Sequence, residues 1–334
     1  MRLATSLLVP SLLAMATALS ASGCTLFAPV EPDAPVVQPA APATPAPAAP
    51  AAAATANTQA VSRVVELGQG LSMLMGQGGN MALLNGPDGL FVVDDQYATN
   101  AAANLAKIEE IAKAKPKFLV NTHWHGDHAG GNEVFAKAGT TIFSSENARR
   151  RLTGQVKSVA RTGQATPASP KDAWPVVTFQ EGIDFHLNGQ TIRVFKSPLP
   201  THTDGDMLIY FVEADVIHMG DTYMKDRYPF VDTGSGGTQA GFIATLNRAL
   251  EIIGPNTKII PGHGDLANRK DVEAALSMHE GARAAVEGLV KGGATLQQAI
   301  AAKPLAQWTP RFGPSGGFIT DDAYVTVIYN ELKK

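Results

Sequence analysis

The sequence predicts an α/β protein in which two αβ halves stack on one another. Three observations lead to this fold class. From about residue 61, short β-type runs and amphipathic helices follow in the order β-rich, helix, β-rich, helix. Hydrophobic residues make up 45% of the 334-residue chain and charged residues 17%, which allows a sizeable core. Turn chemistry, as in Asn85-Gly86-Pro87-Asp88-Gly89, separates neighbouring runs.

Residues 1–24 have the pattern of an export signal rather than of a membrane span. An apolar segment is followed by the small residues 20–23 and then by Cys24, the single cysteine. This arrangement resembles a bacterial lipobox, with Ala21 where leucine is commoner. We predict lipidation at Cys24 and a place on the periplasmic side of the outer membrane, because Thr25 follows where an aspartate would suggest inner-membrane retention. A soluble periplasmic protein is the alternative.

Residues 25–60 are predicted to be an extended, disordered spacer that leads to one folded domain over residues 61–334. Alanine and proline dominate this stretch, prolines forbid a regular helix, and few large apolar groups are present. The net charge of −3 argues against a nucleic-acid partner bound through a basic face. The single cysteine excludes an internal disulfide framework and a thiolate-rich zinc site.

The first half of the domain is predicted to contain mostly short strands. Apolar residues at Ala102, Leu105, Ile108 and Ile111 have helical spacing, which predicts a helix over residues 98–114. The other expected elements are strands at 62–66, 71–75, 81–84, 90–93, 118–120 and 141–143, and helices at 133–138 and 146–152.

In the second half, β-type runs return after a proline-rich connection. Asn188-Gly189 supplies a turn between two of them. The expected strands cover residues 176–179, 184–187, 191–195, 207–212, 216–219 and 258–260. A helix is expected over 242–253, and two C-terminal helices over 271–291 and 296–302.

Potential metal ligands are concentrated between His123 and His128. In an extended segment His123 and His125 point the same way, because alternate side chains share a face, so the pair can chelate one metal ion. Asp127 and His128 follow on the turn into the next helix, where they can reach a second ion. A His-x-His pair alone is a weak signal, but the full His-x-His-x-Asp-His pattern is a strong one.

This pattern resembles that of the metallo-β-lactamase superfamily. The resemblance implies an αββα sandwich with its site at one edge of two sheets, and three further ligands at strand ends. Matching residues are His202 before the run 207–212, Asp221 after the run 216–219, and His263 in Pro261-Gly262-His263-Gly264. Asp94, at the end of the run 90–93, matches the family's buried aspartate that supports the ligand loop.

The same resemblance divides the ligands between two metal ions. The first ion is expected on His123, His125 and His202, the second on Asp127, His128 and His263, with Asp221 as the bridge. Two ligand groups predict two metal ions per chain. Because all donors are nitrogen or oxygen, zinc is the expected metal, with iron or manganese as alternatives.

Such a centre predicts a metal-dependent hydrolase of a small-molecule substrate. Two metal ions that share a water lower its pKa from about 15.7 to about 7, and the bridging hydroxide attacks an ester, lactone, thioester or amide carbonyl. Asp127 is the expected catalytic residue, which orients the nucleophile. Asp221 stands where one β-lactamase subclass has cysteine, so the broader hydrolase family is favoured over a β-lactamase proper, although export and the glycine-rich turns keep that alternative open.

Two further alternatives differ in class. One is an iron-dependent enzyme similar to persulfide dioxygenases, and the other is a non-catalytic metal-binding lipoprotein. The oligomeric state stays open.

Several residues near the ligands are expected to contact substrate. Lys225 or Arg227 could pair with a substrate carboxylate. The residues expected to form an apolar wall are Trp124, Tyr223, Tyr228 and Phe230. The glycine-rich loop 232–237 is interpreted as a connector, and the remaining histidines, His186, His218 and His279, as packed or edge residues rather than ligands.

Overall fold

A computed structural model describes residues 61–157, 165–313 and 317–334, and these belong to one compact unit. The predicted export signal, the lipidation site Cys24 and the spacer up to residue 60 lie outside the described residues. None of the helices in the described ranges combines the length and the apolar character that crossing a bilayer requires.

The first sheet has seven strands that lie side by side in chain order. Strands β1 to β4 pair antiparallel, and β4 to β7 pair parallel. All four residues of β4 are buried, as expected of a parallel strand covered on both faces. The strands are β1 (Arg63–Gly68), β2 (Leu71–Met75), β3 (Met81–Leu84), β4 (Leu90–Val93), β5 (Pro116–Val120), β6 (Thr141–Ser145) and β7 (Val177–Phe179).

The second sheet has five strands in the order β12-β11-β10-β9-β8. Strands β8 to β11 pair antiparallel, whereas β11 and β12 pair parallel with His218 opposite Ile260. The strands are β8 (Gly182–Leu187), β9 (Gln190–Lys196), β10 (Met207–Phe211), β11 (Val216–His218) and β12 (Lys258–Ile260).

The helices begin mostly at polar caps that satisfy their first backbone N–H groups. Asn268 and Asp271 form a capping box at the start of α6, and Thr238 caps α5. The helices are α1 (Ala101–Ala112), α2 (Gly126–Ala129), α3 (Asn132–Lys137), α4 (Glu146–Leu152), α5 (Gln239–Ile252), α6 (Arg269–Lys291), α7 (Leu296–Ala301), α8 (Thr309–Phe312) and α9 (Asp321–Leu332).

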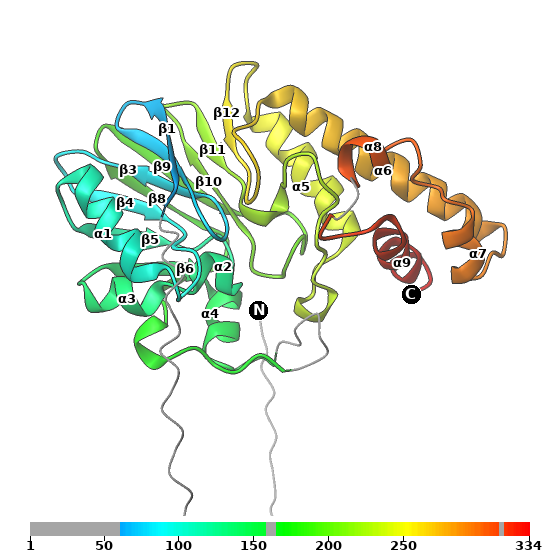
Figure 1. Cartoon of the computed structure of the whole chain (residues 1–334), viewed down its shortest axis with the longest axis horizontal. Coiled ribbons are helices and arrows are strands. Elements are labelled where there is room, and N and C mark those ends of the chain that lie inside the picture. The colour runs from blue at the N-terminus through cyan, green and yellow to red at the C-terminus, as the bar shows by residue number, and fades with distance from the viewer. Residues whose placement is uncertain (1–60, 158–164, 314–316) are drawn as a thin grey trace, which may run out of the picture. The chain divides into compact units, whose positions relative to one another are not determined.

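Apolar side chains join these elements into four layers, α–β–β–α (Figure 1). Between the sheets, the ring of Phe91 from the first meets the ring of Phe211 from the second at 6.2 Å. On the outer face of the first sheet, Ile108 of α1 and Phe135 of α3 are fully buried. Helices α5 and α6 lie on the outer face of the second sheet, and α9 packs against these two helices. The predicted αββα sandwich is confirmed.

Two features differ from the sequence-based prediction. The run at 176–179 was grouped with the second half, but β7 pairs parallel with β6 in the first sheet, because the chain crosses over through α4 and returns beside β6. The C-terminal region holds α8 and α9 in addition to the two predicted helices. In α9, Tyr324, Val325, Ile328 and Tyr329 are buried at helical spacing, a pattern that the aromatic and β-branched composition obscured.

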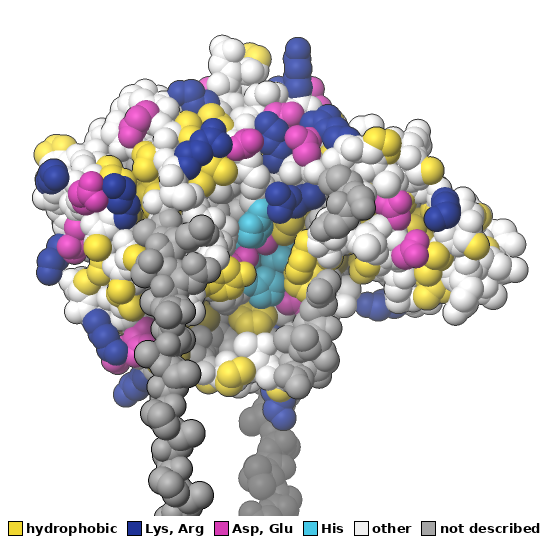
Figure 2. All heavy atoms as spheres, viewed as in Figure 1, with side chains coloured by type: hydrophobic (Ala, Val, Ile, Leu, Met, Phe, Trp, Pro, Cys, Tyr) yellow, Lys and Arg dark blue, Asp and Glu magenta, His cyan; other side chains and the backbone are white. Residues whose placement is uncertain are grey.

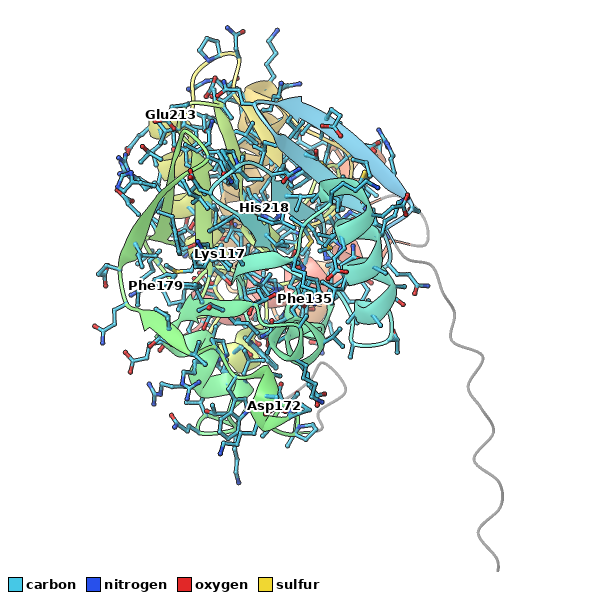
Figure 3. All side chains as sticks on the ribbon, turned by 90° about the vertical axis from the view of Figure 1, so that its left-hand side faces the viewer. Lys117, Phe135, Asp172, Phe179, Glu213 and His218 are labelled. Atoms are coloured by element: carbon cyan, nitrogen blue, oxygen red, sulfur yellow. The ribbon has the colours of Figure 1, made fainter. Side chains whose placement is uncertain are left out.

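The three histidines that were predicted to be packed or edge residues, and not ligands, have the following surroundings. His218 is fully buried between the sheets, and His186 is exposed on the edge strand β8. Figure 3 labels His218 on β11 and Phe135 on α3, both inside the fold. His279 of α6 stacks on Phe242 at 5.2 Å, and its Nδ1 lies 2.6 Å from the Tyr324 hydroxyl.

His279 should make the protein less stable in acid. Burial lowers the pKa of His279 to about 3, whereas a histidine in an unfolded chain has a pKa of about 6.5. The unfolded state therefore binds an extra proton in this range, and stability falls as the pH drops from about 6.5 towards 3. His279→Gln should reduce the slope of the unfolding free energy against pH by up to about 1.4 kcal/mol per pH unit.

Urea titrations at several pH values, with a chelator in every sample, measure this slope. Tyr324→Phe is the matched control, because it removes the hydroxyl next to His279 but keeps the titrating ring. It should lower stability without changing the slope. Equal slopes for the wild type and His279→Gln would contradict the prediction.

Candidate metal centre

The seven predicted ligands come together from loops that follow four strands, β5, β9, β11 and β12. His123 and His125 follow β5, and Asp127 and His128 lie in the short helix α2. His202 lies between β9 and β10, Asp221 follows β11, and His263 follows β12. The histidine side chains visible in Figure 2 lie in a hollow of the surface, with hydrophobic side chains beside them.

The first group of donors consists of His123, His125 and His202, whose ligand atoms lie within 4.8 Å of one another. The Nε2 atom of His202 is 2.7 Å from Nδ1 of His125. The Nε2 atom of His123 is buried and has no hydrogen-bond partner among the described residues. A buried nitrogen in this state is costly unless a ligand occupies the space in front of it.

Hydrogen bonds on the far side of each ring determine which nitrogens carry protons. The Nδ1 atom of His202 faces the carbonyl oxygen of Phe230 at 2.6 Å, and Nε2 of His125 faces the carboxylate of Asp232 at 2.8 Å. Both partners can only accept, so both ring nitrogens must donate. The two nitrogens that face each other at 2.7 Å therefore present lone pairs to one point, which a cation would satisfy.

The second group consists of Asp127, His128, Asp221 and His263, again with ligand atoms within 4.8 Å of one another. The Nε2 atom of His128 lies 3.0 Å from Oδ1 of Asp221 and 3.4 Å from Nε2 of His263. An Asp127 oxygen is 3.2 Å from the same His263 atom. The other Asp221 oxygen, Oδ2, is 3.5 Å from His202 of the first group. Asp221 therefore lies between the two groups.

Electrostatics keep two members of the first group, His123 and His202, neutral. Burial and the neighbouring His128 and His202 lower the pKa of His123 well below its usual value. Burial lowers the pKa of His202 to about 4, although Asp221 opposes this. Neutral imidazoles are the form in which histidine binds metal ions.

The second group attracts positive charge. Burial by itself would raise the pKa of Asp127, but His128 and His263 lower it to about 2. Burial would also lower the pKa of His128, yet the carboxylates of Asp221, Asp127 and Asp94 raise it overall. In the absence of a metal ion, protons on these imidazoles balance the carboxylates. A metal ion would supply the same positive charge.

Asp94 orients one histidine in each group. Its Oδ2 accepts from Nδ1 of His128 at 2.7 Å and from the Thr122 hydroxyl at 2.8 Å. The hydroxyl oxygen of Thr122 in turn faces Nδ1 of His123 at 3.0 Å. The supporting role predicted for Asp94 thus extends through Thr122 to the first group, a link that the sequence pattern did not indicate.

Other residues that fix the ligands were not found from the sequence. Asp206 accepts hydrogen bonds from the backbone N–H groups of His202 at 2.7 Å and Thr203 at 2.9 Å, and so shapes the His202 loop. Asp232 holds His125, so the loop interpreted as a connector also orients a ligand. The sequence does contain a signal for this role of Asp206. It lies four residues after His202, and an aspartate at this spacing can accept hydrogen bonds from the backbone of the same loop.

Two glycines leave room for the ligands. A Cβ on Gly79 would lie 2.1 Å from Cε1 of His128, and one on Gly262 would lie 2.0 Å from Oδ1 of Asp221. Neither distance is possible between non-bonded atoms, so a side chain at either position would displace a ligand. Gly79 comes from the loop before β3 and was not singled out by sequence reasoning.

A cavity of about 730 Å³ opens on the two groups and contains some of the predicted substrate-contacting residues. Trp124 and Tyr228 line it, as does Arg227. Tyr223 is buried and is not part of the lining, and Lys225 points elsewhere, because its ammonium binds the Leu266 carbonyl oxygen at 3.0 Å and lies 3.4 Å from Asp271. The structure thus places Tyr223 and Lys225 outside the cavity where substrate contact was expected.

The clearance at Gly79 leads to a prediction about metal content. Gly79→Ala should displace His128 and lower metal affinity of the second group by about 10–100-fold, the range seen when ligand orientation is lost. Metal content after dialysis, measured by mass spectrometry, checks this. Gly126→Ala is the matched control, because a Cβ at Gly126 meets nothing within 4 Å. Equal metal content and affinity in Gly79→Ala and the wild type would show that the ring of His128 is not confined as described.

Comparisons with known proteins agree with this geometry. A model described as "Metallo-beta-lactamase superfamily" matches residues 74–263. The lactamase-like protein aptB of Emericella nidulans is 26% identical over 260 residues, which is 73% of this chain and 74% of the relative. A hydroxyacylglutathione hydrolase of Pelagibacter ubique is 25% identical over 190 residues, 51% of this chain and 67% of the relative.

Among solved structures, a metallo-beta-lactamase from Pontibacter korlensis matches with a TM-score of 0.54 and 18% identity, over 65% of this chain and 98% of that one. At this identity the likeness concerns the fold. The family match covers 190 of 334 residues and contains six of the seven predicted ligands within its central part and His263 at its end. The chain therefore belongs to the metallo-beta-lactamase superfamily and is a metal-dependent hydrolase.

Proposed function

We propose that the protein is a dinuclear zinc hydrolase that cleaves a carboxylic ester, thioester, lactone or amide of a small molecule. The observation that carries this proposal is the place of Asp221. Its Oδ1 is 3.0 Å from Nε2 of His128, and its Oδ2 is 3.5 Å from Nε2 of His202. A carboxylate so placed can bind both ions of a pair about 3.5–4 Å apart.

The donor set supports zinc. All seven candidate ligands offer imidazole nitrogen or carboxylate oxygen, and none offers a thiolate. When bound, the ions would polarise the substrate carbonyl and lower the pKa of a water molecule. The chain's own side chains must then position that water and keep the substrate in place.

Asp127 is suited to orient the attacking water. Its pKa of about 2 keeps the carboxylate ionised at neutral pH, and its side chain lines the cavity next to His263. In the hydrolysis, the water oxygen forms a bond to the carbonyl carbon, and the bond from that carbon to the leaving oxygen, sulfur or nitrogen breaks. One proton of the water passes to the leaving atom, and an ionised Asp127 can hold it in between.

Among carbonyl substrates, an ester or thioester is favoured over a β-lactam. Asp221 occupies the position at which one β-lactamase subclass has cysteine, and the hydroxyacylglutathione hydrolase relative is by its name a thioesterase. Penicillin and carbapenem belong in the assay panel beside thioester, ester and lactone substrates, because the expected export would bring the protein to the compartment where β-lactams act.

Metal content and the Asp127→Ala variant test the proposal together. The purified chain should hold about two zinc ions, and Asp127→Ala should lower kcat/KM on the best substrate of the panel by about 10²–10⁴-fold. Asp184→Ala is the control, since Asp184 is exposed on β8 and is not among the candidate ligands.

Two results would overturn the proposed function. One is about one iron per chain with oxygen consumption in the presence of a persulfide. The other is a fully active Asp127→Ala variant.

We also propose that the protein is a lipoprotein anchored through Cys24. The support is the sequence pattern alone, an apolar segment and small residues directly before the single cysteine. Cys24→Ser should move the protein from the membrane fraction to the soluble periplasmic fraction, as measured by fractionation and immunoblotting. A Thr25→Ser variant should remain with the membranes. Retention of Cys24→Ser in the membrane fraction would rule out the lipid anchor.

A further inference from the structure

The cavity over the metal centre has a wall that lies outside the part of the chain matched to the family. Five candidate ligands, His125, Asp127, His202, Asp221 and His263, line the cavity. Phe312, Phe318 and Ile319 line it as well, and all three come after residue 263, where the family match ends. We call these three residues the C-terminal wall. They belong to α8 and to the segment between α8 and α9.

A series of aromatic rings connects this wall to the ligands. The ring of Phe230 stacks on His125 at 6.0 Å and meets His202 edge-on at 5.7 Å. The ring of Phe318 in turn meets that of Phe230 edge-on at 5.9 Å. These ring contacts connect the wall to the first group of donors.

Exposed aromatic side chains gather at this cavity. Among the described residues, four large hydrophobic side chains are exposed, and two of them, Tyr97 at 44% and Phe318 at 62%, line the cavity. Exposed apolar surface that borders a concave site is typical of ligand binding rather than of packing. Arg227 lies in the same lining and is itself exposed, so its charge can remain in water while its stem packs against a ligand.

The α8 part of the C-terminal wall is fixed to the loop that follows Asp221. The Tyr228 N–H donates to the carbonyl oxygen of Phe312 at 2.7 Å. Arg311 of α8 binds Asp226 at 2.6 Å and Asp271 of α6 at 3.1 Å. Asp226 and Tyr228 follow Asp221 in the chain, so these contacts hold Phe312 near the candidate metal centre, while Phe318 contacts the ring of Phe230. A fixed apolar surface can bind a ligand group without a large ordering cost.

The geometry points to a specificity-determining role for the C-terminal wall: it binds an apolar acyl group, aliphatic or aromatic, of the substrate. This inference rests on the proposed hydrolysis of a carbonyl compound. The acyl side is assigned on the premise that a metal ion held by the first group would polarise the substrate carbonyl. Phe230 packs on His125 and His202 of this group, whereas Asp127 and His263 belong to the second group. A volume of about 730 Å³ accommodates an acyl chain of medium length beside the reacting carbonyl.

A series of acyl substrates tests the inference with the full zinc-loaded chain. Acetyl, butanoyl, hexanoyl and octanoyl thioesters of one thiol differ only in the group that the wall would bind. Burial of each added methylene should raise kcat/KM by up to about fourfold until the cavity is filled. Phe318→Ala and Ile319→Ala should each lower the ratio of octanoyl to acetyl kcat/KM by about tenfold or more.

A control variant and a ratio of rates separate recognition of the acyl group from a general loss of protein stability. Val176→Ala truncates an apolar side chain that is 74% exposed and lies outside the cavity, and it should keep the wild-type ratio. A merely structural role of Phe318 would lower the acetyl and octanoyl rates by the same factor and leave their ratio unchanged, which would overturn the inference. The inference would also be overturned if kcat/KM rose with the length of the alcohol group of an ester but not with the length of its acyl group.

Calorimetric binding of acetate and octanoate distinguishes this inference from the proposed function. Octanoate should bind the zinc-loaded chain at least about tenfold more tightly than acetate, and Phe318→Ala should reduce this ratio of affinities by about tenfold. If no carbonyl substrate is hydrolysed but this difference in affinity is found, the proposed hydrolysis is wrong and acyl-group binding by the C-terminal wall is supported. If thioesters are hydrolysed without any dependence of kcat/KM on chain length, acyl-group binding by the wall is wrong and the proposed hydrolysis is supported.

Discussion

The metal centre depends on lone pairs that converge on one small buried volume. His125 and His202 face each other with two nitrogens that their outer partners, Asp232 and the Phe230 carbonyl, leave without protons. A buried acceptor without a partner costs about 1–3 kcal/mol, so such an arrangement is stable when a cation occupies it. The outer hydrogen bonds are therefore as necessary to the site as the ligands themselves.

The two sheets bring these ligands together through their parallel strand pairs. In the first sheet Val93 lies beside Val120, so Asp94 and the His123 loop leave the sheet at the same edge. In the second sheet His218 lies beside Ile260, which places the Asp221 and His263 loops next to each other. Parallel pairing aligns the carboxyl ends of neighbouring strands, and polar side chains can then meet without interrupting the core. A metal centre here would connect both halves of the sandwich.

The C-terminal helices have two roles that follow from their packing. Helices α5 and α6 bury the outer face of the second sheet, α9 packs against them, and α8 extends from this layer to the rim of the cavity. The ion pairs of Arg311 with Asp226 and Asp271 join α8 both to the ligand loop and to α6. The same segment that completes the core thus shapes the space in front of the metal centre.

The sequence, with the family resemblance that it carries, determined the α/β fold class and the set of candidate ligands, because these depend on short-range patterns. Period-two runs and helical spacing indicate which face of each element is buried, and His-x-His-x-Asp-His places four donors within six positions. The family resemblance then located His202, Asp221 and His263 at the ends of later runs.

Only the tertiary structure decided which distant residues meet the ligands. Asp232 lies 107 positions from His125, and Gly79 lies against His128 across two loops, so no local pattern relates them. Lys225 was a plausible substrate contact by its nearness to Asp221 in the chain, but Asp271 and the Leu266 carbonyl bind it instead. Phe318 became part of the site because long-range packing, which sequence spacing does not encode, places α8 and α9 beside the ligand loop.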